Sequence, residues 1–292
     1  MTITLVFDEG PGAGLGHRRR CEHLAAALHT LGVPTELRPL RPGGHVEAAV
    51  LLVDSYLARA DDTDRFRAGR VLAIDDIARD LAVDLVVDPD PGADAAHHTR
   101  AGRVLAGATY ALVDPSLRDL VTVPVDRPVE RVLVTTGGAD AAGIGGTIAT
   151  ACKTLLPDVE VRCVEGPWGA PVNDPDVHTV RAPAALGGEL AAADIVVTAG
   201  GVTLLEACAL GRPVVACAIA ANQTGSVAGA AHVGAVLATD PSSAPDVVTR
   251  LAHDGALRAR LATAATTLVD GQGATRVAAA VAAIASQESQ FR

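Results

Sequence analysis

The sequence predicts an α/β protein built from two doubly wound, parallel-sheet domains. Apolar runs of strand length alternate with segments of helical periodicity along the chain, a pattern typical of parallel sheets with crossover helices. The chain has 292 residues, enough for two domains, and 49% of them are hydrophobic, enough for two cores. In each half a strand leads through a glycine-rich turn into a helix, which places ligand-binding groups at the carboxyl edge of the sheet.

In the first half, helical periodicity is clearest after the first strand, where Cys21, Leu24 and Leu28 fall on one face. The strands expected in this half are residues 2–8, 34–38, 49–54, 70–75, 83–88 and 109–113. The helices expected there are residues 17–31 and 57–68, with a weaker segment near 93–105.

The second half repeats the alternation and ends in three consecutive helical segments. The strands expected here are residues 131–136, 159–164, 177–180, 193–198, 213–218 and 235–238. The helices expected here are residues 141–154, 184–191, 203–210, 222–232, 243–252, 255–269 and 273–285.

Residues 114–128 contain three prolines and little helical pattern, so they are the expected linker. We therefore expect one Rossmann-like domain over residues 1–126 and a second over residues 127–292, with their strand ends facing each other across a cleft. The pattern does not decide which domain the closing helices join.

Composition excludes several classes of function. A net charge of −10 and an aromatic content of 2% argue against binding a nucleic-acid strand. No apolar run reaches the length of a membrane helix, and no signal peptide is recognisable, so we expect a soluble, cytoplasmic protein without a membrane partner. The five cysteines form no CxxC pair and the histidines do not converge, so we expect buried reduced thiols, no metal and no cofactor.

The turn at Gly14 and Gly16 delivers His17 to the start of the first helix. His17 and Arg20 lie four residues before Cys21 and Leu24, so both continue the inward stripe toward the strand ends. A helix N-terminus favours a neutral imidazole, which suits a general base. The alternative is a histidine that only bonds a nearby carbonyl group.

Polar residues also end the other central strands of the first half. Asp8 follows the first strand and is the nearest candidate to orient His17 or to lie in the cleft floor, although such acids often only form turns. Tyr56 follows another strand and could place its hydroxyl in the cleft, or be a half-buried ring. Asp76 follows a third strand.

Two glycine-rich turns in the second half could form paired anion sites, as a diphosphate requires. The first turn is Gly137-Gly138, followed by Asp140, and the second is Gly200-Gly201. Glu206 either accepts hydrogen bonds from a ribose or forms a capping box with Thr203.

Two further segments of the second half have open interpretations. Asn222, which precedes Gln223, is either a helix N-cap or an amide directed into the cleft. Trp168 could stack on a base, or be an exposed loop aromatic.

These segments together resemble one family, the nucleotide-sugar hydrolases of pseudaminic acid biosynthesis and their spore-coat polysaccharide relatives, in the GT-B superfamily. The matching stretches, in order over residues 1–235, are Gly14-x-Gly16-His17-x-x-Arg20-Cys21, Val53-Asp54-Ser55-Tyr56, Ile74-Asp75-Asp76, Gly107-x-x-Tyr110-Ala111-Leu112-Val113, Gly137-Gly138-x-Asp140, Ala193-Asp194 through Ala199-Gly200-Gly201-x-Thr203-Leu204-x-Glu206-x-Cys208-Ala209-Leu210-Gly211-x-Pro213, and Asn222-Gln223.

The resemblance implies UDP bound mainly by the second domain, the sugar facing the first domain, and no metal. It implies His17 as the general base, with Tyr56 and Asn222 beside the sugar. The implied substrate-binding residues are Asp8, Gly14, Gly16, Arg20, Asp76 and Gln223. The implied nucleotide-binding residues are Gly137, Gly138, Asp140, Gly200, Gly201, Thr203 and Glu206.

The expected activity is therefore hydrolysis of a UDP-linked sugar at the anomeric carbon, with His17 activating water. A GT-B glycosyltransferase that uses a hydroxyl acceptor is the first alternative. Val6, Gly10, Val202 and Ala221 depart from the family pattern. A non-catalytic nucleotide-sugar binding protein is therefore the second alternative.

Overall fold

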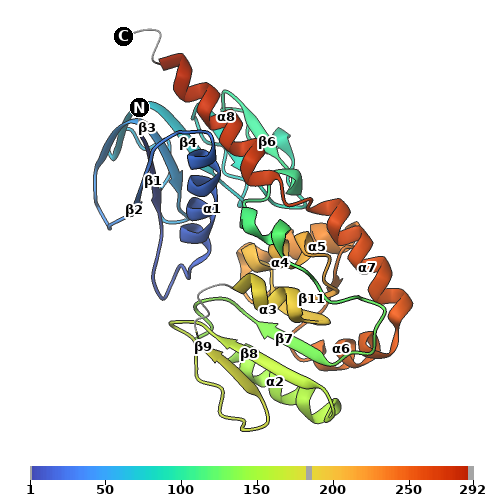
Figure 1. Ribbon diagram of the computed structural model, residues 1–292. Coiled ribbons are helices and arrows are strands. Elements are labelled where there is room, and N and C mark those ends of the chain that lie inside the picture. The colour runs from blue at the N-terminus through green and yellow to red at the C-terminus, as the bar shows by residue number, and fades with distance from the viewer. Residues whose placement is uncertain (1, 182–185, 289–292) are drawn as a thin grey trace. The chain divides into compact units, whose positions relative to one another are not determined.

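The computed structural model describes residues 2–181 and 186–288 and divides into two compact units (Figure 1). Unit 1 comprises residues 1–115 together with 272–292, and unit 2 comprises residues 116–271. Each unit contains one six-stranded parallel sheet. None of the described helices combines the length and apolarity needed to cross a membrane.

The sheet of unit 1 has the strand order β2-β1-β3-β4-β5-β6. Its strands are β1 (Ile3–Phe7), β2 (Thr35–Pro39), β3 (Val46–Asp54), β4 (Phe66–Ile74), β5 (Leu85–Asp88) and β6 (Val104–Ala106). The central strand β1 pairs with β2 and β3 in parallel and is buried on both faces, which explains its uninterrupted apolar run.

Two helices from opposite ends of the described chain cover one face of this sheet. Helix α1 (Gly16–Thr30) and helix α8 (Gly273–Glu288) contact each other and share one apolar cluster with the strands (Figure 1). Leu24 and Leu28 of α1 and Val277 and Val281 of α8 are completely buried in this cluster. The final helix therefore belongs to unit 1.

Loops cover the opposite face of the sheet of unit 1, and the helix expected over residues 57–68 is wrong. The Asp62 side chain accepts hydrogen bonds from the backbone N–H groups of Asp64 and Arg65, which favours a turn over a helix. Phe66 then enters β4 in register with Val46 and is buried on this face. Pairing with β3 thus overrides the local helical pattern.

The sixth strand is β6 rather than residues 109–113, where the sequence predicted a strand. Gly107 reverses the chain with φ of 102°, and the 3₁₀-helix η2 (Ala108–Tyr110) follows. Leu112 and Val113 are buried without joining the sheet. The weak helix near 93–105 is reduced to η1 (Ala95–His97), followed by β6.

Unit 2 follows the sequence-based expectation closely. Its sheet order is β12-β11-β10-β7-β8-β9. The strands are β7 (Arg131–Thr135), β8 (Glu160–Glu165), β9 (His178–Arg181), β10 (Ile195–Ala199), β11 (Val214–Cys217) and β12 (Leu237–Ala238). The helices are α2 (Ile144–Leu155), α3 (Leu186–Ala192), α4 (Val202–Ala209), α5 (Thr224–His232), α6 (Ala244–His253) and α7 (Gly255–Leu268), with η3 (Pro115–Asp119) before β7 and η4 (Ala221–Gln223) before α5. Residues 184–185 of the expected helix 184–191 lie outside the described residues.

The units divide the chain at positions other than the expected 126/127 boundary, because the proline-rich segment is bonded into unit 2. Val123 N–H donates to the Ala191 carbonyl at 3.2 Å, and the Arg258 guanidinium donates to the carbonyls of Val125 and Arg127. The segment is therefore part of unit 2.

Asp194, before β10, anchors the start of this sheet. Its carboxylate accepts hydrogen bonds from Arg127 Nε (2.7 Å) and from the backbone N–H groups of Glu130 (2.9 Å) and Arg131 (2.8 Å). We expect Asp194→Ala to lower the free energy of unfolding by about 2 kcal/mol, because the substitution leaves three partly buried donors without their acceptor. Urea unfolding monitored by fluorescence of Trp168, which lies in unit 2, measures this loss. Glu130→Ala, an exposed control, should change it by under about 0.5 kcal/mol, and an equal effect of both variants would contradict the prediction.

Candidate functional site

The glycine turn before α1 sets the direction of the helix. Gly14 N–H donates to the Gly10 carbonyl at 2.7 Å, which closes a short loop, and both glycines have positive φ values that other residues rarely adopt. Helix α1 then starts at Gly16 with no side-chain cap. His17 and Arg20 therefore lie in the first turn of α1, at the carboxyl edge of the sheet.

His17 and Arg20 share one buried carboxylate at the end of β3. His17 Nδ1 lies 2.6 Å from Asp54 Oδ1, and Arg20 contacts the same carboxylate through Nε at 2.9 Å and Nη2 at 2.7 Å. The Asp54 side chain is completely buried and that of His17 is 3% exposed. The first turn of α1 is thus tied to β3 by a charged cluster.

The charges of this cluster fix the tautomer of His17. Burial raises the pKa of Asp54, but the nearby charges of Arg20 and His17 and their hydrogen bonds outweigh burial and lower it below the ordinary value. Arg20 Nη2 also lies 3.0 Å from His17 Nδ1, but the Asp54 carboxylate is closer, at 2.6 Å. An ionised carboxylate can only accept, so Nδ1 carries the hydrogen and donates it to Asp54. Nε2 is therefore the nitrogen available to accept a proton, the arrangement required of a general base.

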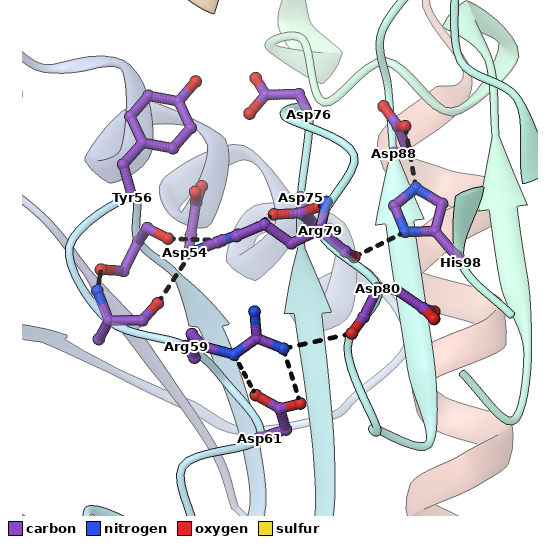
Figure 2. Close-up of polar contacts among 12 residues, drawn as sticks. Asp54, Tyr56, Arg59, Asp61, Asp75, Asp76, Arg79, Asp80, Asp88 and His98 are labelled. Carbon is purple, nitrogen blue, oxygen red and sulfur yellow. Dashed lines mark hydrogen bonds and ion pairs between the residues drawn. The ribbon is translucent and has the colours of Figure 1, made fainter. Parts of the chain in front are cut away.

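Tyr56 and Asp76 complete this edge of unit 1. The ring of Tyr56 meets the His17 ring edge-on, with centroids 4.3 Å apart. Asp76 Oδ2 pairs with Arg20, while Asp76 Oδ1 is buried without a hydrogen-bond partner among the described residues. Figure 2 shows Asp54, Tyr56 and Asp76 at the ends of neighbouring strands β3 and β4.

Asp8 holds the Tyr56 loop rather than His17. Its Oδ2 accepts hydrogen bonds from Ser55 Oγ at 2.8 Å and from the backbone N–H groups of Tyr56 at 2.9 Å and Leu57 at 3.2 Å. Arg79 braces the same loop from the other side, because its Nη2 donates to the Ser55 carbonyl at 2.7 Å (Figure 2). Asp8 and Arg79 are therefore positioning residues.

A second histidine–carboxylate pair lies farther along the same sheet. His98 Nδ1 contacts the Arg79 carbonyl and its Nε2 contacts Asp88 Oδ2, both at 3.1 Å (Figure 2). Burial raises the pKa of Asp88 above its ordinary value. Burial also raises the pKa of Asp90 to about 6, assisted by the charges of Asp88 and Asp76.

In unit 2, the first glycine turn is occupied by a carboxylate of the protein itself. Asp140 accepts hydrogen bonds from Thr136 Oγ1 at 2.7 Å and from the backbone N–H groups of Ile144 (3.0 Å) and Gly145 (2.7 Å), the first residues of α2. These donors are the ones that would bind a phosphate after Gly137-Gly138. A phosphate at this helix end would also meet the charge of Asp140.

The second glycine turn leaves its helix end open. Gly201 is the N-cap of α4 and no side chain caps this end, so Thr203 is the second helical residue rather than a cap. A capping box between Thr203 and Glu206 is therefore wrong. Gly200 has to be glycine because a Cβ would lie 2.8 Å from the Gln223 carbonyl oxygen.

The Asn222-Gln223 pair divides into one structural and one exposed side chain. Gln223 Oε1 accepts a hydrogen bond from Ile219 N–H at 3.0 Å and so closes its own loop. Asn222 lies in η4 and is exposed. Because Ala220 caps η4 and Gln223 caps α5, the N-cap interpretation of Asn222 is wrong.

The described residues contain no group of three histidine, cysteine, aspartate or glutamate side chains arranged to hold a metal ion. All five cysteines are free and buried, as predicted.

Comparison with known proteins places this architecture among solved structures. No protein-family model matches the sequence, and no curated protein matches it. Staphylococcus aureus MnaA, solved with UDP, has a TM-score of 0.65 at 12% identity, with 94% of this chain and 94% of that chain covered. A protein named as a UDP-N-acetylglucosamine 2-epimerase from Listeria monocytogenes has a TM-score of 0.59 at 13% identity, covering 96% and 95%. The glycosyltransferase SnogD from Streptomyces nogalater has a TM-score of 0.57 at 18% identity, covering 98% and 99%.

The chain has the GT-B fold. The two parallel six-stranded sheets are the Rossmann-like halves of this fold. At these identities the likeness concerns the fold and does not extend to the hydrolase family that the motifs resemble.

Sequence reasoning missed Asp54 and Arg79 as members of the polar cluster at this sheet edge. The sequence contained the information needed to find Asp54, because Asp54 ends an apolar run as Asp8 does. Two such runs in a parallel sheet end at the same edge, so both carboxylates are expected there. Arg79 lies in an irregular loop, where no periodicity indicates the direction of a side chain.

Asp90 makes unit 1 sensitive to pH. Since the pKa of Asp90 in the folded chain is about 6 against an ordinary 3.8, its stabilising contribution is complete below about pH 4 and is lost as pH rises to 6. We expect Asp90→Asn to raise the melting temperature relative to the native chain. The difference should be near zero at pH 4, increase up to about pH 6 and stay constant at higher pH.

The control is Asp80→Asn, which should behave in the opposite direction. Hydrogen bonds from the Arg100 backbone N–H and the Thr99 hydroxyl lower the pKa of Asp80, so its contribution is present at neutral pH and lost on acidification. Thermal melts followed by circular dichroism between pH 3.5 and 7.5 would contradict both expectations if each variant differed from the native chain by a constant amount.

Proposed function

We propose that this protein is a glycosyltransferase that moves the sugar of a nucleoside diphosphate sugar to a hydroxyl acceptor, with His17 as the general base. The observation that carries the proposal is the buried hydrogen bond from His17 Nδ1 to Asp54, which leaves Nε2 of the neutral ring as the proton acceptor at a carboxyl sheet edge. Solved proteins of this fold include glycosyltransferases and a protein solved with UDP, which agrees with the assignment.

In the proposed reaction, His17 Nε2 removes the proton of the acceptor hydroxyl as the oxygen attacks the anomeric carbon. The bond between that carbon and the diphosphate oxygen breaks, and the electron pair leaves with the nucleoside diphosphate. Asp54 stabilises the imidazolium that forms, and the proton later passes to solvent. A single displacement inverts the anomeric configuration.

We assign the nucleoside diphosphate to unit 2. The open N-terminus of α4 offers backbone N–H groups and a positive dipole to the departing charge. Thr203, in the first turn of α4, supplies a hydroxyl, and Glu206 farther along α4 is the candidate for the ribose. The turn at Gly137-Gly138 is the weaker phosphate site because Asp140 already occupies its donors.

Two exposed apolar side chains next to the polar cluster in sequence favour an acceptor over water. Leu57 is 83% exposed and directly follows Tyr56, and Ile77 is 36% exposed and directly follows Asp76. Exposed large apolar side chains beside a polar site are typical of a surface that binds an apolar part of a ligand. The proposed acceptor is therefore a hydroxyl compound with an apolar portion.

Hydrolysis is the second candidate function. It is favoured by the ordered motifs shared with the hydrolase family, above all the segment from Gly14 to Cys21. Water would take the place of the acceptor hydroxyl, and His17 would perform the same proton transfer.

Product analysis tests the proposal. The protein is incubated with UDP-, dTDP- and GDP-linked sugars, with and without a panel of apolar alcohols and phenols, and the products are identified by mass spectrometry. A glycoside that forms only with an acceptor supports transfer, whereas free sugar in every reaction favours hydrolysis. Binding of the donors without turnover in any reaction would overturn both enzymatic functions.

We expect His17→Ala to lower kcat by at least about 100-fold, because a positioned base contributes this much to proton transfer. The affinity for the nucleoside diphosphate should stay unchanged, since that ligand is assigned to unit 2. His29→Ala is the matched control, because His29 is exposed in the last turn of the same helix. Equal turnover by the two variants would refute the assignment of His17.

Asp54→Asn tests the role of the tautomer separately from the presence of the imidazole. An amide can donate to Nδ1 and so leave the hydrogen on Nε2, which lowers kcat by about 10³- to 10⁴-fold in comparable dyads. The loss of kcat should persist at high pH. If the substitution only changed the pKa of His17, kcat would recover at high pH, where the imidazole is neutral. Because the variant also leaves Arg20 with less counter-charge, its circular dichroism spectrum and its affinity for UDP serve as controls for folding.

A further inference from the structure

The chain contains one tryptophan, Trp168, at a defined place on unit 2. It lies in the loop that follows β8, at the carboxyl edge of the sheet, and its side chain is half-buried. No hydrogen-bond partner of its indole N–H is found among the described residues. A large aromatic side chain is thus partly open at the edge where ligands of this fold class bind.

The backbone around Trp168 is fixed against the first glycine turn. Trp168 N–H donates to the Gly138 carbonyl at 3.0 Å, and Ala170 N–H donates to the Asp140 carbonyl at 2.9 Å. A Cβ on Gly166 would lie 2.6 Å from Gly138 Cα, so the two loops touch backbone to backbone. The backbone that carries the indole is therefore fixed before any ligand arrives, which lowers the entropic cost of stacking.

Charge and strand order define which part of a nucleotide can bind beside Trp168. Asp140 neutralises the N-terminus of α2, so the turn beside Trp168 disfavours a phosphate. The open N-terminus of α4 follows β10, and β10, β7 and β8 are consecutive in the sheet. Two strand spacings, about 10 Å, separate the ends of β10 and β8, which leaves room for a ribose between a phosphate and an aromatic ring.

We propose that Trp168 is the stacking platform for the nucleobase of the nucleoside diphosphate. The proposal rests on the proposed function only in assigning that ligand to unit 2. Stacking on an aromatic face contributes affinity for every base, because each base has a π-face. Trp168 therefore supplies binding strength, and selection among bases falls to other groups.

Because Trp168 is the sole tryptophan, its fluorescence reports directly on this contact. UDP, dTDP, ADP and GDP are titrated into the full chain beside inorganic pyrophosphate, and binding is measured in parallel by calorimetry. We expect the nucleotides that bind to quench the emission of Trp168 and pyrophosphate to leave it unchanged.

Substitution provides the second measurement. Trp168→Ala should weaken binding of UDP by about 10- to 100-fold, as expected for the loss of one base-stacking contact, without changing the affinity for pyrophosphate. Trp168→Phe should retain most of the affinity, and it keeps the test valid if the alanine variant folds poorly. Pro167→Ala, at the exposed neighbour in the loop, is the matched control and should bind UDP as the native chain does.

The outcomes separate the two proposals. Nucleotide binding with unchanged fluorescence and equal affinity of Trp168→Ala overturns the stacking role and leaves the proposed function intact. An equal loss of UDP and pyrophosphate affinity in both Trp168 variants also overturns stacking, because it indicates a disturbed loop. Failure of every nucleotide to bind the native chain overturns the assignment of the ligand to unit 2 as well.

Discussion

The burial of Asp54 is the constraint on which the arrangement of unit 1 depends. A carboxylate without solvent is unstable unless charged donors surround it, and α1 supplies both His17 and Arg20 from one turn. This requirement fixes the angle at which the helix leaves the glycine turn and the pairing of Arg20 with Asp76. The same contacts that satisfy the buried charge also determine which imidazole nitrogen carries a hydrogen, so stability and chemistry share one cluster.

The two glycine turns of unit 2 show how similar motifs acquire different electrostatic character. Both follow a strand and precede a helix, yet Asp140 supplies an internal anion to α2, whereas α4 has no capping side chain. A single acidic residue four positions after Thr136 places a negative charge at one of the two helix ends. The uncapped helix end and the aromatic ring of Trp168 thereby fall at separate points of one sheet edge.

The sequence predicted most of the fold because parallel strands buried on both faces have a strong apolar signature, as β1 and β10 show. The failures lie where long-range pairing or loop geometry overrides local pattern. Phe66 starts a strand because β3 is available to pair with it. Leu112 packs in the apolar cluster that contains α1 and α8, without joining the sheet. Within the site, the position of His17 followed from helical periodicity, but its partner Asp54 depended on the register of β1 with β3.

The membership of α8 in unit 1 has a consequence for how the chain acquires its structure. Unit 1 consists of two stretches separated by the whole of unit 2, and Val277 and Val281 complete its apolar interior. During synthesis on the ribosome, the first sheet emerges with α1 in place but without α8, the second helix of that face, until all of unit 2 has been translated. All residues of unit 2 are therefore translated before the apolar interior of unit 1 can be completed.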